Sequence, residues 1–352
     1  MPYCECQTDG FCQRYRRDMT GRFRQICQGT NVDLGTAAAF REQWAREAQP
    51  PVKSNEQPTP LILHTDQMPG DTVVMTAAIH SLHRAYPGRY TTAVISQHPE
   101  VFSYNPDVIP VTTDAAVLHM HYPAIHLCNE RGIHFMQGWT EFLGSALKIN
   151  IPLLTNRPRL YFPDPEPPTE DYWLICSGGK RDFTTKLWGT HNYQEVVHSL
   201  KGAVRFVQVG NSRDEHSRLH GVEDIVGKTT LRELFNWTRR ARGVLCGVSL
   251  LMHVAAALEK PAVVVAGGRE PVQWNAYPRQ QYIHTVGMLP CRSVQGHIGH
   301  ACWRSRVVPL SDGSVYDQNT CEFPVNSVPK CMQAIFPATI ADQVMRYNEL
   351  AN

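Results

Sequence analysis

Short apolar runs of strand length alternate with helical patterns along most of this chain. Residues 61–65 (LILHT) and 91–96 (TTAVIS) flank a helical pattern over 72–88. Strand–helix–strand at this spacing predicts parallel strands joined by right-handed crossovers. The second half repeats the pattern, with strands at 173–177, 205–210, 243–248 and 261–268 and helices at 192–202, 230–242, 251–260 and 338–352. The alternation predicts an α/β fold of two Rossmann-like domains with a cleft between them.

Two segments rich in proline and polar residues divide the chain. Residues 49–60 (QPPVKSNEQPTP) and 161–171 (YFPDPEPPTED) have the composition of linkers. A length of 352 residues also agrees with two domains. We therefore expect three parts, a Cys-rich N-terminal extension with linker at 1–58, a first Rossmann-like domain at 59–163 and a second at 164–352.

Composition excludes several classes of protein. Thirty-four Lys and Arg residues oppose 32 Asp and Glu, so no chain-wide positive field draws the protein to nucleic acid. No apolar run approaches the roughly 20 residues that span a bilayer. The first ten residues, MPYCECQTDG, lack the basic flank and apolar stretch of a signal peptide. We expect a cytoplasmic protein with no membrane span.

Eight of the 11 cysteines fall into two groups near the ends of the chain. They are Cys4, Cys6, Cys12 and Cys27, followed by Cys291, Cys302, Cys321 and Cys331. A reducing compartment disfavours disulfides, and four thiolates are typical ligands of zinc or iron. We expect a structural Zn or Fe ion at these groups, with His297 or His300 as a substitute ligand. Neither group has paired CxxC spacing, so buried inert thiols or a disulfide remain alternative interpretations.

Between the first group and the linker, residues 31–48 show a helical pattern that Asp33 can cap.

The first candidate ligand loop follows the strand at 61–65. In open parallel sheets, ligands lie beyond the carboxyl ends of the strands. Gly70 permits close backbone approach there, and Asp71 and Thr72 begin the next helix. The Asp71 carboxylate is a candidate base for an acceptor hydroxyl. The alternative is that Asp71 is a helix N-cap, which is a common use of aspartate.

The second candidate loop follows the strand at 173–177. Gly178 and Gly179 precede Lys180 and Lys186, which is a composition suited to a phosphate-bearing ligand. The loop is neither a Walker motif nor a GxGxxG fingerprint. Solvated surface lysines are therefore the alternative interpretation.

The third candidate region surrounds the two following strands. A small-residue helix beginning near Ser249 presents backbone N–H groups to an anion, over Ser249, Leu250, Leu251, Met252 and His253. His253 also fits the description of a buried core histidine. After the next strand, Gly268 is followed by Arg269 and Glu270, which we expect to reach a ribose or base.

Taken together, these segments resemble glycosyltransferase family 9, the ADP-heptose:lipopolysaccharide heptosyltransferase group with a GT-B fold. The resemblance covers about residues 61–290. It rests on GDTVVMTAAIHSLHRAYPG (70–88), GGKRDFTTKLWGTHNYQEVV (178–197) and IVGKTTLRELFNWTRRARGVLCGVSLLMHVAAALEKPAVVVAGG (225–268). Their order and spacing make the joint pattern specific.

This resemblance implies an inverting transferase that moves a sugar, of heptose type, from a nucleotide-diphosphate sugar to an acceptor hydroxyl. Asp71 would be the general base, Lys186 would bind the donor phosphates, and the backbone at 249–253 would hold the diphosphate. The acceptor is a glycan, a protein side chain or a modified nucleic-acid base. No catalytic metal is implied. Some relatives that glycosylate autotransporter proteins carry a four-cysteine iron site, which the tail resembles with different spacing.

One departure from the family pattern supports an alternative. The family has Asp-(Ser/Thr)-Gly before its Met/Ser-His helix start, whereas this chain has Val248-Ser249-Leu250. The donor contact made through that carboxylate is therefore not carried over. A degenerate, non-catalytic GT-B protein that binds a nucleotide or a partner is the alternative function. An NAD-dependent oxidoreductase is disfavoured because the glycine fingerprint is missing.

Overall fold

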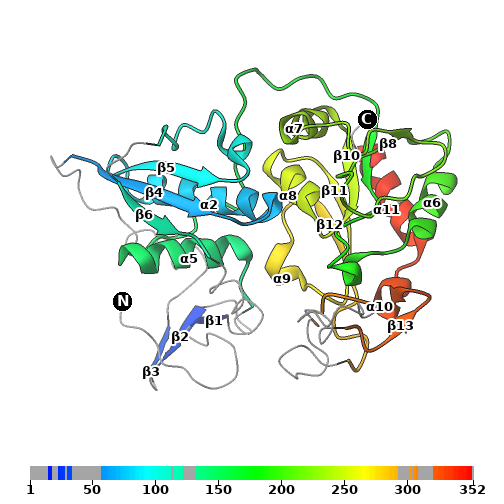
Figure 1. The fold of residues 1–352 in the computed structure, drawn as a ribbon. Helices are drawn as coiled ribbons and strands as arrows, with labels where there is room; N and C mark the ends of the chain where they lie inside the picture. Colours follow the sequence, from blue (N-terminus) through cyan, green and yellow to red (C-terminus); the bar gives the residue numbers. More distant parts are fainter. Residues whose placement is uncertain are drawn as a thin grey trace. The chain divides into compact units, whose positions relative to one another are not determined.

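The computed structural model describes residues 15–17, 23–27, 30–33, 57–111, 115–121, 132–291, 302, 304–307 and 320–350. The chain forms two compact units (Figure 1). Unit 1 takes its described residues from Met1–Gln67, Met75–Gln97 and Asn105–Thr155. Unit 2 comprises Met68–Val74, His98–Tyr104 and Asn156–Asn352. The short segment that carries Asp71 therefore groups with unit 2, although the strands on either side of it belong to unit 1.

Unit 1 contains a three-stranded parallel sheet in the order β5-β4-β6. Its elements are β4 (Thr59–Thr65), α2 (Pro69–Ala85), β5 (Tyr90–Ser96), β6 (Ala116–His119) and α5 (Phe135–Leu147). The predicted strand–helix–strand crossover over 61–96 is present, because α2 joins two parallel neighbours. In Figure 1, α5 runs along this sheet. Leu63 of β4 and Leu82 of α2 are fully buried.

A small antiparallel sheet precedes this crossover. It consists of β1 (Tyr15–Arg17), β2 (Phe23–Cys27) and β3 (Thr30–Asp33). The helix predicted over 31–48 is wrong at its first residues, because 31–33 pair with β2 in β3. Val32 favours a strand, and the ladder hydrogen bonds to β2 override the weak helical periodicity there. The rest of 31–48 lies outside the described residues.

Unit 2 contains a six-stranded parallel sheet in the order β12-β11-β10-β7-β8-β9. The strands are β7 (Trp173–Cys176), β8 (Phe206–Gln208), β9 (Glu223–Asp224), β10 (Gly243–Gly247), β11 (Ala262–Gly267) and β12 (Gln280–His284). Numbered along the chain, this order is that of a Rossmann fold. Every residue of β7 and β11 is buried, which explains why these strands are continuous apolar runs in the sequence.

Helices cover both faces of this sheet (Figure 1). The helices and 3-10 turns of unit 2 are η1 (Pro99–Phe102), η2 (Thr184–Lys186), α6 (Thr190–Ser199), α7 (Leu231–Arg240), α8 (Leu250–Ala257), α9 (Val272–Asn275), α10 (Lys330–Gln333) and α11 (Pro337–Leu350). Helices α7 and α8 lie on one face and α6 and α11 on the other. A short hairpin, β13 (Pro324–Val325) with β14 (Val328–Pro329), precedes α10.

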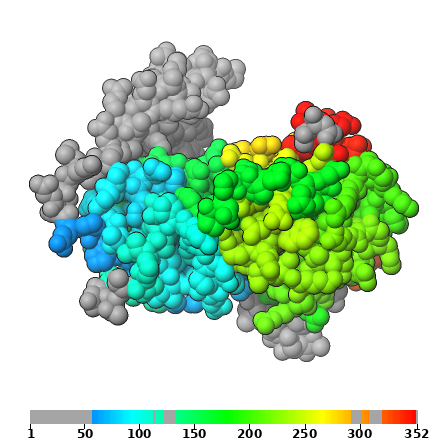
Figure 2. Space-filling view, turned by 90° about the horizontal axis from the view of Figure 1, so that it is seen from above, coloured from blue at the N-terminus to red at the C-terminus, as the bar shows by residue number. Residues whose placement is uncertain are grey.

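Local sequence explains where these helices begin and end. Thr230 caps α7 through a reciprocal capping box with Glu233, which satisfies two otherwise unpaired backbone donors. Helix α11 ends at the surface, red in Figure 2, and Leu350 is exposed there. Within the described part of the chain, none of the helices combines the length and the apolar character needed to cross a membrane.

Candidate functional site

The strand order of unit 2 reverses between β7 and β10. Cys176 of β7 is directly opposite Cys246 of β10, so the loops that follow these two strands begin side by side. In a Rossmann sheet, the connections leave in opposite directions at this position and open a ligand crevice. The predicted loop at 177–188 follows β7, and the predicted helix start at Ser249 follows β10. The fold therefore brings two of the predicted loops to the position where parallel sheets bind ligands.

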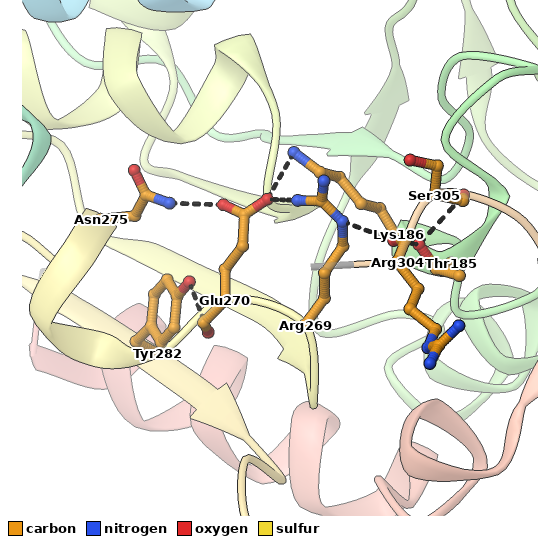
Figure 3. A network of polar contacts seen from close by, with 8 residues as sticks. All are labelled: Thr185, Lys186, Arg269, Glu270, Asn275, Tyr282, Arg304 and Ser305. Carbon is orange, nitrogen blue, oxygen red and sulfur yellow. Dashed lines mark hydrogen bonds and ion pairs between the residues drawn. The ribbon is translucent and has the colours of Figure 1, made fainter. Parts of the chain in front are cut away.

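A buried ion-pair cluster lies beside this position (Figure 3). The Lys186 ammonium at the end of η2 lies 2.7 Å from the Glu270 carboxylate, which follows β11. Arg269 also pairs with Glu270. Asn275 of α9 donates its side-chain amide to the other Glu270 oxygen. Glu270 is only 2% exposed, whereas the Lys186 side chain is 29% exposed.

Two cations, Lys186 and Arg269, share the Glu270 carboxylate in this cluster. Burial acts to raise the pKa of Glu270, but Lys186 and Arg269 outweigh it and hold the pKa below its usual range. Burial lowers the pKa of Lys186, and Glu270 opposes that effect. The Glu270 carboxylate is thus engaged by Lys186, Arg269 and Asn275, and its contact with a ribose or base stays a prediction. The two cations at the ends of neighbouring loops are side chains of the kind that bind anions.

Helix α8 begins beside this cluster. Ser249 is its N-cap residue in extended conformation, but the Ser249 side chain does not cap the helix. Leu251 and Met252 are buried in the first turn. His253 is 6% exposed, and its Nδ1 lies 2.8 Å from the Tyr277 hydroxyl, with the rings edge to face. Because no side chain caps this start, the backbone amides remain suited to an anionic ligand.

Asp71 lies in the first turn of α2. The helix begins two residues earlier, at Pro69, so the interpretation of Asp71 as the N-cap is wrong. Proline is favoured at a first helical position because its missing N–H would have no helical partner there, and this moves the helix start upstream of Asp71. The charge of Asp71 acts on both Tyr277 and Lys186. Burial raises the pKa of Tyr277, and Asp71 raises it further. Burial lowers the pKa of Lys186, and Asp71 opposes that effect.

Two neighbours of Asp71 have structural roles. A Cβ atom at Gly70 would lie 3.4 Å from His253 Cδ2 and 3.5 Å from Leu250 Cα, so Gly70 packs directly against the start of α8. Thr72 is fully buried and donates its hydroxyl to the Met68 carbonyl. The structure thus brings the predicted residues Gly70, Asp71 and Lys186 into one region of unit 2 with His253.

The glycine pair after β7 packs against the segment that follows β8. Gly179 and Glu215 exchange both backbone hydrogen bonds, so the Gly179 amide is already paired. A Cβ atom at Gly178 would overlap the Glu215 carbonyl and the His216 ring. The two glycines thus make room for the segment after β8. Lys180 lies over the Phe183 ring, 5.9 Å from its centroid. Phosphate binding by these three residues stays a prediction.

The four C-terminal cysteines share one small cavity. Cys291, Cys302, Cys321 and Cys331 all line a space of about 20 Å³, which is room for one water-sized particle. Burial raises the pKa of every one of these thiols, that of Cys302 to about 11. Gly268 borders the cavity too, since a Cβ there would lie 3.2 Å from Cys331 Sγ.

The thiol donor set fits a soft metal ion, and the cavity fits a single ion rather than a cluster. Within the described ranges, however, no group of three or more His, Cys, Asp or Glu side chains is arranged to hold a metal ion. The four thiols line one cavity without forming a tight ligand set, and metal binding by them stays a prediction. Of the N-terminal group, Cys27 lies in β2, whereas Cys4, Cys6 and Cys12 lie outside the described residues, as do His297 and His300.

Sequence reasoning missed several polar residues of the site. Asn275 and Tyr277 follow Glu270 in the segment REPVQWNAY, where a mixture of amide and aromatic residues after a glycine turn is the available signal. Tyr282 donates its hydroxyl to the Glu270 carbonyl. Thr185 and Arg304 also join the cluster (Figure 3). Arg304 comes from the cysteine-rich tail, and no local pattern predicts its position.

Rossmann-like parallel sheets with ligand loops at the strand ends define the chain as a protein of the GT-B class, and solved structures agree. The iron-containing dodecameric glycosyltransferase TibC of enterotoxigenic Escherichia coli is 16% identical, with a TM-score of 0.59 over 94% of this chain and 83% of that one. TibC has also been solved in complex with ADP-D-beta-D-heptose. A family 9 glycosyl transferase of Veillonella parvula is 12% identical, with a TM-score of 0.57 over 83% and 97%. The E. coli ADP-heptose LPS heptosyltransferase II is 13% identical, with a TM-score of 0.53 over 83% and 99%.

Part of unit 2 resembles a known family in sequence. Residues 157–299 match the model of glycosyltransferase family 9 (heptosyltransferase). The resemblance expected from the sequence is confirmed. No curated protein sequence matches the chain.

Proposed function

We propose that this protein is an inverting glycosyltransferase that transfers a sugar from a nucleoside-diphosphate sugar to an acceptor hydroxyl. The observation that carries the proposal is the pair of cations, Lys186 and Arg269, at the loops beside the start of α8, which no side chain caps. Cationic side chains and a helix start of this kind both bind anions such as a diphosphate. The family 9 match over 157–299 supports the same class of donor.

Three groups of this chain would divide the reaction between them. The Asp71 carboxylate accepts the proton of the acceptor hydroxyl, and the oxygen attacks the anomeric carbon from the side opposite the diphosphate. The bond between the anomeric carbon and the diphosphate oxygen breaks, and the configuration inverts. The nucleoside diphosphate leaves with its added charge stabilised by Lys186 and by the amides of α8.

The donor is proposed to carry a heptose. TibC, a structural neighbour, was solved with ADP-D-beta-D-heptose, and other neighbours are named as heptosyltransferases. The acceptor is a glycan, a protein side chain or a modified nucleic-acid base. Arg269, Glu270 and Gly268 follow the strand next to β10, where the nucleoside end of a donor would lie if its diphosphate occupies the switch point.

We further propose that Cys291, Cys302, Cys321 and Cys331 hold one structural zinc or iron ion. Their shared cavity and soft donor set support this role, and the neighbour TibC is iron-containing. When bound, the ion would cross-link Cys291, in the segment after β12, to the three cysteines of the tail. Elemental analysis of the protein as purified should find about one metal per chain at this quartet. Cys331→Ser should lose it, and a wild-type protein without metal would refute the assignment.

The transferase proposal is tested with a panel of nucleotide sugars. Release of nucleoside diphosphate is measured for the wild type, for Asp71→Asn and for Asp66→Asn, an exposed carboxylate close by in the chain. We expect ADP-heptose to be consumed, Asp71→Asn to lose at least 100-fold in rate, as is typical for a general base, and Asp66→Asn to retain it. Thermal stabilisation by a nucleotide, without release from any sugar, would favour a non-catalytic binding protein instead.

A further inference from the structure

We propose that the four-thiol cavity is an effector site for the anion-binding cluster, so that a thiophilic ion in the cavity and a diphosphate at Lys186 strengthen each other's binding. The inference rests on the proposed function for the diphosphate half. It adds a regulatory link between the cavity and the cluster, and it assigns no catalytic role to any residue. The argument comes from the residues that the cavity and the cluster share.

Two walls of the cavity belong to the loops that carry the cluster. Thr185 and Arg269 both line the cavity. Thr185 directly precedes Lys186, and Arg269 directly precedes and pairs with Glu270. A change in the shape of the cavity therefore acts on the backbone on either side of the Lys186–Glu270 ion pair.

One main-chain carbonyl joins these two walls. The Arg304 carbonyl, two residues after Cys302, accepts a hydrogen bond from the Thr185 hydroxyl and another, of 2.8 Å, from Arg269 Nε (Figure 3). The neighbouring Ser305 carbonyl accepts the Thr185 amide at 3.1 Å. The segment that follows Cys302 thus forms hydrogen bonds with Arg269 and with Thr185, the residue before Lys186.

The side chain of Arg304 points back to the cavity. Its guanidinium contacts the Glu322 carboxylate at 2.5 Å and the Thr320 carbonyl at 3.0 Å. These two residues flank Cys321, and both Arg304 and Glu322 line the cavity. Arg304 therefore contacts the anion cluster through its main chain and the cysteine segment through its side chain.

A second connection runs through Gly268. The Gly268 carbonyl accepts the Cys302 amide at 3.3 Å, and Gly268 lies against Cys331. Gly268 is followed directly by Arg269 and Glu270. An ion that draws the four thiols together has to move Cys302 and Cys331, and both are bonded to or packed on the loop that presents Glu270. Buried hydrogen-bonded contacts of this kind transmit small displacements because the packed interior cannot absorb them.

Coupling of this kind is reciprocal and can be measured without turnover. A chelator first removes any ion that the four thiols already hold, and circular dichroism checks that the protein stays folded. Cd²⁺ is then the probe for the thiols, followed by the ultraviolet absorption of cadmium–thiolate bonds, and inorganic pyrophosphate is the probe for the cluster, followed by calorimetry. Saturating pyrophosphate should tighten Cd²⁺ binding at least fivefold, and saturating Cd²⁺ should tighten pyrophosphate binding by the same factor. Equal affinities with and without the second probe would overturn the inference while leaving the proposed function intact.

Other outcomes separate the two proposals. A protein that binds no pyrophosphate, with or without Cd²⁺, refutes the proposed donor site and the coupling with it. A protein that binds pyrophosphate but takes up no Cd²⁺ at the four thiols refutes the coupling alone.

The route through Thr185 has a matched pair of variants. Thr185→Val keeps the branched shape and removes the hydroxyl that bonds to the Arg304 carbonyl, whereas Thr185→Ser keeps the hydroxyl. We expect the coupling factor to fall toward one in Thr185→Val and to persist in Thr185→Ser. A third variant, Glu322→Gln, breaks the ion pair at the cavity end and should lower the factor too. A coupling factor that is undiminished in both Thr185→Val and Glu322→Gln would overturn the proposed route.

Discussion

The Glu270 carboxylate is paired with both Lys186 and Arg269, and its removal has a calculable cost. Glu270→Gln keeps the side-chain shape but removes the negative charge that both cations contact. Removing one partner of a buried ion pair costs about 3–5 kcal/mol. The Lys186 side chain is 29% exposed and can turn partly to solvent, so we expect the lower end, about 3 kcal/mol.

A loss of about 3 kcal/mol should lower Tm by roughly 6–12 °C, at the 2–4 °C per kcal/mol typical of units of this size. The assay is thermal or chemical unfolding followed by circular dichroism. The control is Glu259→Gln, because Glu259 pairs with Arg157 at a position where its side chain is 59% exposed. An exposed pair contributes at most about 1 kcal/mol.

Pyrophosphate adds a second readout to this experiment. A bound diphosphate restores negative charge between Lys186 and Arg269, so it should raise Tm more in Glu270→Gln than in the wild type. If Glu270→Gln unfolded at the wild-type temperature, the account of the cluster as a stabilising buried ion-pair site would be refuted. A destabilised variant that gained nothing extra from pyrophosphate would show that the cluster is structural and does not receive the anion.

Three further predictions concern local features. Gly178→Ala should lower the free energy of unfolding by about 1–3 kcal/mol, because its Cβ would overlap the Glu215 carbonyl. In the control, Gly179→Ala, the new Cβ meets only the end of the Leu187 side chain, and similar urea midpoints for the two variants would contradict this account. Burial lowers the pKa of His216 and of His83, although Asp214 and Asp107 partly oppose this effect. As the pH falls, both histidines are therefore protonated in the unfolded chain, near pH 6.5, before they are protonated in the folded protein. Their contribution to the free energy of unfolding is therefore complete above about pH 6.5 and is lost as the pH falls through the folded pKa values; urea titrations at pH 7.5 and 5.5 should show the loss, and a more stable protein at pH 5.5 would oppose it. Tyr277→Phe removes the hydroxyl 2.8 Å from His253 Nδ1 and should cost about 1 kcal/mol in unfolding assays, while an unchanged stability would mean that this buried contact contributes nothing.

The strands of unit 2 were predictable because they are buried on both faces. Residues such as Leu245 and Val263 are fully buried, and burial on both sides produces the continuous apolar runs that the sequence displays. The ligand loops followed from the same argument, since parallel strands present their carboxyl ends at one edge. Helix starts were harder to predict from the sequence. Helix α2 begins at Pro69, two residues before Asp71, whose side chain suggested an N-cap.

The contacts inside the site were not predictable from local sequence. Glu270 is separated by 84 positions from Lys186, and Arg304 lies 119 positions from Thr185. Local periodicity carries no information on such pairings. Each was visible only as a charged residue near a strand end or in the cysteine-rich tail. The four cysteines have 10, 18 and 9 residues between them, and their position around one cavity depends in the same way on where β12 and α10 place the chain.

The allocation of Met68–Val74 to unit 2 limits how this protein can be divided. A fragment that begins at Asn156 retains all six strands of the Rossmann sheet and the Lys186–Glu270 pair, but it lacks the turn that carries Asp71. Cutting the chain at the proline-rich connection therefore separates the carboxylate from the amine whose pKa it influences. Half-molecules recombined in a test tube would have to dock that one turn correctly before the proposed proton transfer to Asp71 could take place.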